Sequence, residues 1–180
     1  HDITERKETE GRIVQLNRVY AVLSGINALI VRVSDRDELF RGACRIAVEA
    51  GGFRLAWLGV VDRVAMQIKP VAWHGVGDEF IKGIRLGLGE TKSEGRGIAA
   101  QAIVERKPMI TVDMTRDPRV LQKKLALQHG LRSLVVLPLL VADEAVGVLA
   151  LYAGQVGLFD GEEIKLLTEL AGNIAFALAQ

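Results

Sequence analysis

The sequence has little of what most catalytic centres are built from. One cysteine, Cys44, and three histidines stand among 180 residues. A single cysteine cannot form an intrachain disulfide or a cysteine-built metal site, so we expect a reducing, cytoplasmic setting. Acidic and basic residues nearly cancel, at a net charge of +1, and this gives no broad electrostatic footprint for nucleic acid or for an anionic membrane. The hydropathy pattern predicts neither a membrane-spanning segment nor a signal peptide.

Aromatic residues are also scarce, at 5% of the chain, although 49% of the residues are apolar. The core must therefore be built mainly from Leu, Val, Ile and Ala. The length fits one globular domain with a sizeable core. Internal repeats and low-complexity tracts are absent from the sequence, so a repeat architecture is not expected.

The segment Ile13–Val33 has a helical pattern with a heptad seam. The seam residues are Ile13, Leu16, Tyr20, Leu23, Asn27 and Ile30, and Val19, Ile26 and Val33 widen the stripe. A stripe this wide suggests packing on its own domain and on a partner at once. Asn27 on the seam either fixes register and oligomer number or simply reaches solvent, and the pattern does not decide between the two.

The next segments predict a helix and then a pair of strands. Asp35 begins the helix, whose apolar face includes Leu39, Cys44 (or Ala43), Ile46, Ala47 and Ala50, and Gly51-Gly52 ends it. Phe53–Val61 and Ala65–Trp73 read as strands joined by the turn Asp62-Arg63. Because the turn is so short, the two strands must be antiparallel.

A glycine-punctuated region, His74–Gly97, separates this pair from the second half of the chain. Phe80, Ile81 and Ile84 predict a short helix or turn there. We then expect a helix over Ile98–Glu105, a strand over Pro108–Val112, and a helix from Pro118 to about His129 with Gly130 as its stop.

Leu131–Tyr152 consists of two apolar runs that flank the short polar tip Asp143-Glu144, the pattern of a buried antiparallel hairpin. Phe159-Asp160-Gly161-Glu162-Glu163 then begins a helix, in which Asp160 caps and Glu163 completes a capping box. The helix continues with apolar residues at helical spacing, namely Ile164, Leu167, Leu170, Ala171, Ile174 and Leu178.

This C-terminal half resembles a GAF domain, a small sensory or regulatory module related in shape to PAS domains. The resemblance rests on the "Ser-Leu…Pro-Leu" strand, the "Gly-Val-Leu-Ala-Leu" strand and the "Phe-Asp-x-Glu-Glu" helix. The stretch from Gly97 to Arg119 fits the same pattern, so the resemblance covers about residues 37–180. We therefore expect an α+β fold with a central antiparallel sheet of five or six strands, the terminal helices on one face and short helices and loops on the other.

The first residues resemble something different. "Asp-Ile-Thr-Glu-Arg-Lys" is similar to the exit segment of a PAS domain, so we interpret residues 1–12 as a linker and residues 13–180 as the GAF domain with its signalling helices. On this interpretation the chain is an excised piece of a longer protein. Its neighbours would be a PAS domain and an output domain such as a kinase or cyclase, as in bacterial two-component or cyclic-dinucleotide signalling.

The resemblance implies a cytoplasmic signalling module that binds a small molecule, relays a state through paired terminal helices, or does both. GAF domains place ligands between one sheet face and the glycine-rich loops, here the segment Gly87–Asp117. The candidate pocket residues are Trp57, Trp73, Arg96, Asp113, His129 and Ser133. The tryptophans could form rigid apolar walls, and Asp113 and Ser133 could orient a ligand. A tryptophan in a strand is more often plain core, with its N–H satisfied locally, and a dimerisation and relay module without any ligand is the alternative function.

Catalysis is not expected. Some GAF relatives reduce free methionine sulfoxide with several cysteines, whereas this chain has only Cys44, on an apolar helix face. Relatives that attach a bilin use a cysteine at another position, and His129 is favoured as a cation at a helix C-terminus over a heme ligand. Neither heme nor a bilin is therefore expected, and the identity of any cofactor stays open. The loop Ser93–Gly97 could bind an anion at a helix N-terminus, but its glycines are favoured as turn formers.

The predicted partner is a second copy of the chain. A parallel homodimer would bury the surplus apolar surface of both terminal helices. Its expected contact residues are Leu16, Tyr20, Leu23, Asn27, Ile30, Leu167 and Ile174. Asn27 would pair with its own copy near the axis.

Overall fold

The computed structural model describes residues 2–82, 86–88, 97–120, 122–157 and 159–179. Six strands form one sheet in the order β3-β2-β1-β6-β5-β4, and every pairing among the described strands is antiparallel. The elements are α1 (Asp2–Arg32), α2 (Arg36–Gly51), β1 (Leu55–Asp62), β2 (Gln67–Gly75), α3 (Asp78–Lys82), β3 (Leu86–Gly87), α4 (Ile98–Glu105), β4 (Met109–Thr111), α5 (Lys123–Gln128), β5 (Ser133–Val141), β6 (Glu144–Ala153) and α6 (Gly161–Ala179). The predicted α+β fold is confirmed.

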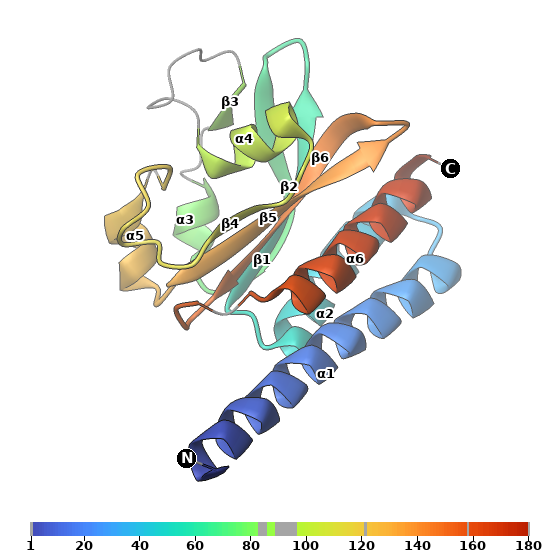
Figure 1. Ribbon diagram of the computed structural model, residues 1–180. Helices are drawn as coiled ribbons and strands as arrows, with labels where there is room; N and C mark the ends of the chain where they lie inside the picture. Colours follow the sequence, from blue (N-terminus) through green and yellow to red (C-terminus); the bar gives the residue numbers. More distant parts are fainter. Residues whose placement is uncertain (1, 83–85, 89–96, 121, 158, 180) are drawn as a thin grey trace.

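The sheet separates two hydrophobic cores. Helices α1, α2 and α6 cover one face, and α3, α4, α5 and the connecting loops cover the other (Figure 1). Successive side chains of a strand point to opposite faces of the sheet and so contribute to both cores. Ala56 and Leu58 of β1 lie in the helix-side core, whereas Leu55 and Trp57 lie in the loop-side core. Strands buried on both faces explain the nearly continuous apolar runs of the sequence.

The two hairpins form as the turn residues predict, with shifts of a few residues. Asp62 Oδ1 accepts hydrogen bonds from the backbone N–H groups of Val64 and Ala65, both at 3.0 Å, and closes the β1–β2 turn. The β5–β6 turn consists of Ala142 and Asp143, with φ values of 50° and 66°. The predicted tip Asp143-Glu144 is therefore wrong by one position, because a two-residue turn with positive φ at both residues matches the twist of a hairpin best.

Helix α1 begins at Asp2, well before the predicted start at Ile13, and residues 3–14 are exposed. Its fully buried residues are Val19, Val22, Ile26 and Leu29, which pack on the helix-side core or on α2. By length and composition alone, Ile3–Arg32 could also cross a membrane, a criterion that core helices of soluble proteins and signal sequences meet as well. The interpretation of residues 1–12 as a PAS exit stays a prediction.

The starts of helices α5 and α6 compare differently with the prediction. Helix α5 begins at Lys123, so the predicted start at Pro118 is wrong. Residues 117–119 instead form a pinned loop, described below. Helix α6 begins as predicted, because Asp160 Oδ1 accepts a 2.9 Å hydrogen bond from the backbone N–H of Glu163. The Glu163 side chain bonds Gln15 of α1 rather than completing the capping box.

Candidate functional site

The two predicted pocket tryptophans are cross-strand neighbours. Trp57 of β1 lies directly opposite Trp73 of β2 in the antiparallel register, so both side chains point to the loop-side face. Their exposure differs: Trp57 is 1% exposed, whereas Trp73, nearer the sheet edge, is 36% exposed. The structure therefore brings these two residues together, and Trp73 is the more accessible of the pair.

Trp57 is held by a tyrosine that the sequence reasoning did not select. Its indole Nε1 donates a hydrogen bond of 3.0 Å to the hydroxyl of Tyr152 on β6. The Tyr152 ring packs edge-on against Phe80 of α3, with ring centroids 5.7 Å apart. Burial raises the pKa of the Tyr152 hydroxyl well above its ordinary value, against the smaller lowering effect of the Trp57 bond, so the hydroxyl stays neutral. Trp57, Tyr152 and Phe80 thus form a packed aromatic group on the loop side of the sheet, and the indole N–H of Trp57 has its hydrogen-bond partner within this group.

Asp113 lies in the loop after β4, and its side chain forms hydrogen bonds within that loop. Its Oδ1 accepts hydrogen bonds from the backbone N–H of Thr115 at 3.0 Å and from the Thr115 hydroxyl at 2.6 Å. These bonds lower the pKa of Asp113 and keep it ionised. One carboxylate oxygen is therefore occupied by a turn within the loop, and the other is 3.7 Å from the exposed Arg116 guanidinium.

His129 follows α5 and stands on the loop-side layer. Its backbone carbonyl accepts hydrogen bonds from Nε and Nη2 of Arg54, at 3.3 and 3.1 Å. Its ring lies against Gly77, whose φ of 85° excludes most side chains there. The contacts of His129 thus fasten the end of α5 to the start of β1 and to the loop before α3.

Ser133 lies on the opposite face of the sheet from the tryptophans. It shares strand parity with Val135 and Leu137, which are part of the helix-side core. Its hydroxyl donates a 2.6 Å hydrogen bond to the carbonyl of Gln155. The structure therefore does not place Ser133 in the expected pocket, because a one-residue step along β5 changes the face. Arg96 lies outside the described residues.

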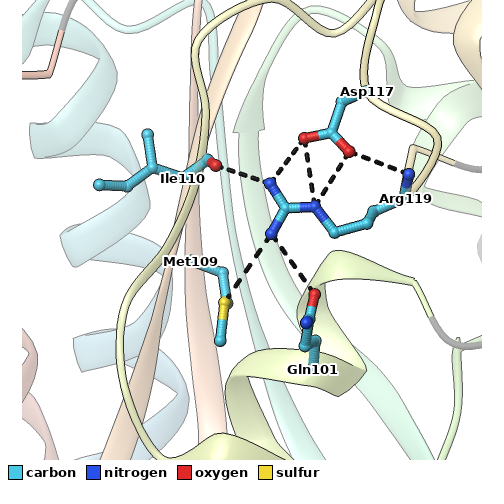
Figure 2. Close-up of polar contacts among 5 residues, drawn as sticks. All are labelled: Gln101, Met109, Ile110, Asp117 and Arg119. Atoms are coloured by element: carbon cyan, nitrogen blue, oxygen red, sulfur yellow. Dashed lines mark hydrogen bonds and ion pairs between the residues drawn. The ribbon is translucent and has the colours of Figure 1, made fainter. Parts of the chain in front are cut away.

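A cluster around Arg119 pins the loop that follows β4 (Figure 2). Its guanidinium forms a paired contact with Asp117, with Nη2 2.6 Å from Oδ2 and Nε 2.9 Å from Oδ1. Nη2 also donates to the carbonyl of Ile110 at 2.8 Å, and Nη1 approaches Gln101 Oε1 of α4 at 3.4 Å. The cluster therefore connects α4, β4 and the loop.

This cluster explains why no helix forms at Pro118. The bond from Arg119 lowers the pKa of Asp117 to about 2, so the pair is ionised at neutral pH. Paired arginine–carboxylate bonds are among the strongest in proteins, and here they hold residues 117–119 in a tight loop. Nearly all the donors of Arg119 are used, so the cluster supports the loop-side layer instead of offering a free binding group. In the sequence, the one feature that could have predicted this ion-paired loop is an acid and an arginine on either side of a proline, Asp117-Pro118-Arg119.

Cys44 lies in the helix-side layer, across the sheet from the predicted pocket. It is fully buried on α2, and its thiol donates a weak 3.7 Å hydrogen bond to the carbonyl of Ala72. Burial raises the pKa of Cys44 to about 12. Because the thiolate is the nucleophilic form, this side chain is poorly suited to attack a substrate.

The residues expected at a dimer interface occupy two different environments. Leu167 and Ile174 of α6 are fully buried in the helix-side core of their own chain. The prediction that they lie at a dimer interface is therefore wrong: they are core residues, because the apolar face of α6 packs against the sheet of its own chain. On α1, Leu16, Leu23 and Ile30 are half-buried and Tyr20 is 52% exposed.

Asn27 joins the two terminal helices within one chain. Its Oδ1 accepts a 2.9 Å hydrogen bond from Nδ2 of Asn173 on α6. The expected partner was a second Asn27, whereas the single chain supplies Asn173. An exposed polar pair of this kind fixes how α1 and α6 lie against each other.

Solved structures of similar shape come from a reductase, a phosphotransferase and a protein assigned as a sensor kinase. The free methionine-R-sulfoxide reductase of Neisseria meningitidis, in complex with its substrate, aligns with a TM-score of 0.75 and 20% identity, over 89% of this chain and 88% of that chain. The GAF domain of a phosphoenolpyruvate-protein phosphotransferase from Coxiella burnetii aligns with a TM-score of 0.75 and 17% identity, over 91% and 94%. A domain assigned to a two-component sensor histidine kinase of Sinorhizobium meliloti aligns with a TM-score of 0.60 and 14% identity, over 79% and 90%.

At these identities the similarity shows the fold alone. A search of curated protein sequences finds no match to this chain. The model of the GAF domain family, in contrast, matches residues 33–179, which include α2, the whole sheet and α6. The chain therefore belongs to the GAF domain family.

Proposed function

We propose that this chain is the sensory GAF module of a multidomain cytoplasmic signalling protein. It would bind a small molecule on the loop side of the sheet and relay the bound state through its terminal helices in a homodimer. Neighbouring PAS and output domains would stand on either side in the longer protein.

The arrangement of the terminal helices is the observation that supports this proposal. Helices α1 and α6 pack side by side on one face of the sheet, away from the loop-side layer (Figure 1). The N-terminal part of α1 extends beyond the sheet, with residues 3–14 exposed. A change on the loop side could reach these helices through the sheet, whose strands contribute side chains to both cores. This geometry suits a relay between neighbouring domains.

The proposed ligand site lies between the sheet and the segment Gly87–Asp117. Trp73 would supply an accessible apolar wall, and Trp57 a buried one. The ligand would be small and at least partly apolar, because aromatic walls favour flat or aliphatic groups. Much of the segment, residues 89–96, lies outside the described residues, so the pocket itself remains a proposal.

A relay module without a ligand is the second candidate. The observation that favours it is the packing around Trp57, where Tyr152 satisfies the indole N–H and Phe80 covers the tyrosine ring. A site that is already filled and satisfied has little to gain from a ligand.

We further propose that the chain does not catalyse a reaction. A reductase of the methionine sulfoxide type needs an attacking thiolate and a resolving thiol, whereas the sequence holds one cysteine. That cysteine is buried, has a raised pKa and faces the helix-side core. In the described residues, no three His, Cys, Asp or Glu side chains gather as metal ligands would.

Native mass spectrometry of the purified chain tests the ligand. Under gentle desolvation, we expect a co-purified small molecule that adds a discrete mass. Trp73→Ala should weaken its binding by about 1–3 kcal/mol through loss of apolar contact. Trp57→Phe, which keeps most of the volume, tests the buried wall with less risk to folding than Trp57→Ala.

Val71→Ala is the matched control, because Val71 is 40% exposed on the same strand. Binding that neither tryptophan change alters would move the site elsewhere. A chain that repeatedly carries no added mass would favour the relay without a ligand. Turnover of methionine sulfoxide by the pure chain would contradict the regulatory proposal.

A further inference from the structure

A buried carboxyl group lies at the point where α1 leaves the domain. Glu163, in the first turn of α6, is 3% exposed. Its side chain accepts a hydrogen bond from the side-chain amide of Gln15. Among the α1 side chains that the structure describes, Gln15 is the first that is half-buried, since residues 3–14 are exposed. The Glu163–Gln15 contact thus fastens α1 to the start of α6 next to the exposed N-terminal part of α1.

This fastening leaves the carboxyl group half satisfied. Oε2 of Glu163 is buried and has no hydrogen-bond partner among the described residues. An ionised carboxylate that is buried and half satisfied is costly, whereas a protonated one needs fewer partners. Burial, and then the nearby Asp160 carboxylate, raises the pKa of Glu163 to about 7, in agreement with this geometry.

A groove of about 620 Å³ runs beside the contact, between α1 and the start of α6. The charged groups that line it with Glu163 are Glu8, Arg12 and Arg18 of α1 and Asp160 of the preceding loop. Asp160 is already engaged as the helix cap. Arg12 and Arg18 form no ion pair within the described part of the chain.

Of these two cations, Arg12 is the better placed to reach Glu163. Arg12 and Arg18 stand three residues before and after Gln15, so spacing alone places both on its face of α1, and what distinguishes Arg12 is its place beside the start of α6. Arg12 also lines a second groove, of about 550 Å³, together with Asp160, Gly161 and Glu162. Arg18 instead lies over Gly52 and lines a separate groove beside Arg54, away from the start of α6.

We propose that Glu163 is a proton-controlled switch for the position of α1. The bond from Gln15 favours the ionised form less than burial and Asp160 oppose it, so we assign the Gln15 contact of the structure to the neutral carboxyl group. The ionised carboxylate exchanges Gln15 for Arg12, which offers a charged partner. An exchange over three residues corresponds to an axial offset of about 4.5 Å, part of which the longer arginine side chain takes up.

The switch goes beyond the proposed sensing of a small molecule and does not depend on it. It acts on the helix that would carry the signal, at the point where that helix leaves the domain. Acidification would favour the Gln15 contact and alkalinisation the Arg12 contact. The module would then report pH, or modulate another signal according to pH.

Distance measurements by pulsed electron paramagnetic resonance test the switch. Spin labels at Thr4→Cys and Thr168→Cys would report on α1 and α6, because both positions are exposed and Cys44 is buried. Dilution with unlabelled chain removes distances between copies. We expect the distance distribution to differ between about pH 5.5 and about pH 8.5, on either side of the titration.

Two variants and two controls assign the change. E163Q should keep the low-pH distribution at both pH values, and R12Q should lose the high-pH distribution. E162Q, at an exposed position in the same turn, and R18Q should behave like the wild type. In NMR spectra of the chain labelled with carbon-13, the chemical shift of the Glu163 carboxyl carbon should change over the same pH range.

A distribution that does not change with pH would overturn the proposal, and so would an equal change in E163Q. A pH response that is lost in E163Q but retained in R12Q would overturn the exchange with Arg12. Loss of the response in R18Q alone would do the same.

Discussion

Trp57 and its hydrogen-bond partner Tyr152 stand 95 positions apart in the sequence. The pair shows how single side chains in this domain depend on partners from distant segments. Glu163 depends on Gln15 in the same way, and Asn173 on Asn27. Each of these polar groups would be costly to bury or immobilise alone, and each is satisfied only after the layers have assembled.

Glu163 should make the stability of the domain depend on pH. The pKa of Glu163 is about 7 in the folded chain against an ordinary glutamate value of 4.5, so the folded state binds the proton more tightly than the unfolded state. The stabilisation is fully present below about pH 4.5 and is lost as the pH rises through about 7, by roughly 3 kcal/mol at most. Urea unfolding of the wild type and of E163Q between these pH values would measure it.

E163Q should show a flatter pH dependence than the wild type, because the amide does not titrate. E162Q serves as the control, since Glu162 is exposed. If the wild type and E163Q lost stability in parallel over this range, Glu163 would not be the responsible group.

At the scale of elements, the loop-side layer is held by contacts between loops instead of by long helices. The Arg119 cluster connects α4, β4 and the loop after β4 (Figure 2). Arg54 connects the start of β1 to the end of α5 through the carbonyl of His129. A layer built in this way can change locally while the sheet stays intact.

Arg119→Met should loosen the loop after β4 without unfolding the sheet. The change keeps most of the side-chain length but leaves Asp117 and the Ile110 carbonyl without their partner. We expect a loss of about 1–3 kcal/mol in stability. Amide hydrogen exchange within residues 109–120 should become faster, whereas exchange in β5 and β6 should not change.

Arg116→Met is the matched control, because the Arg116 side chain is 88% exposed and its ion pair with Asp113 is 3.7 Å long. Equal effects of the two substitutions on exchange would show that the Arg119 cluster does not pin the loop.

At the scale of the whole molecule, the exposed apolar residues of the helix layer concentrate on α1. Ile13, Val14, Tyr20 and Val31 are between 50% and 88% exposed. A twofold pair of such helices would cover this surface. In contrast to the sequence-based expectation, α6 would contribute little through Leu167 or Ile174, which are buried in their own chain.

The chain should therefore form a homodimer through α1. Analytical ultracentrifugation at about tens of micromolar, a range suited to weak interfaces, should show a concentration-dependent dimer. Tyr20→Glu should shift the chain to monomer, because it places a charge on the proposed contact surface. Val64→Glu is the control, since Val64 is 98% exposed at the tip of the β1–β2 hairpin. A monomer at every concentration, or equal effects of both changes, would contradict this interface.

The amino-acid sequence by itself determined the family and most of the elements, although not the starts of α1 and α5. The bounds of α4, the cap at Asp160, the stop at Gly130 and the antiparallel hairpins all follow from local spacing and turn chemistry. These features depend on residues a few positions apart, which is why a linear pattern is enough to predict them. The GAF motifs are local in the same sense.

Only the tertiary structure decided which side chains meet. Ser133 turned to the helix-side face, Glu163 bonded Gln15 instead of its own helix start, and Asp117 paired with Arg119 where a helix was expected. Such outcomes depend on strand register and on contacts between layers. A shift of one residue in strand register moves a side chain to the other face of the sheet, and a partner from another layer can replace a local hydrogen-bond partner. The local sequence pattern therefore decides neither the face of a strand side chain nor the partner of a polar group.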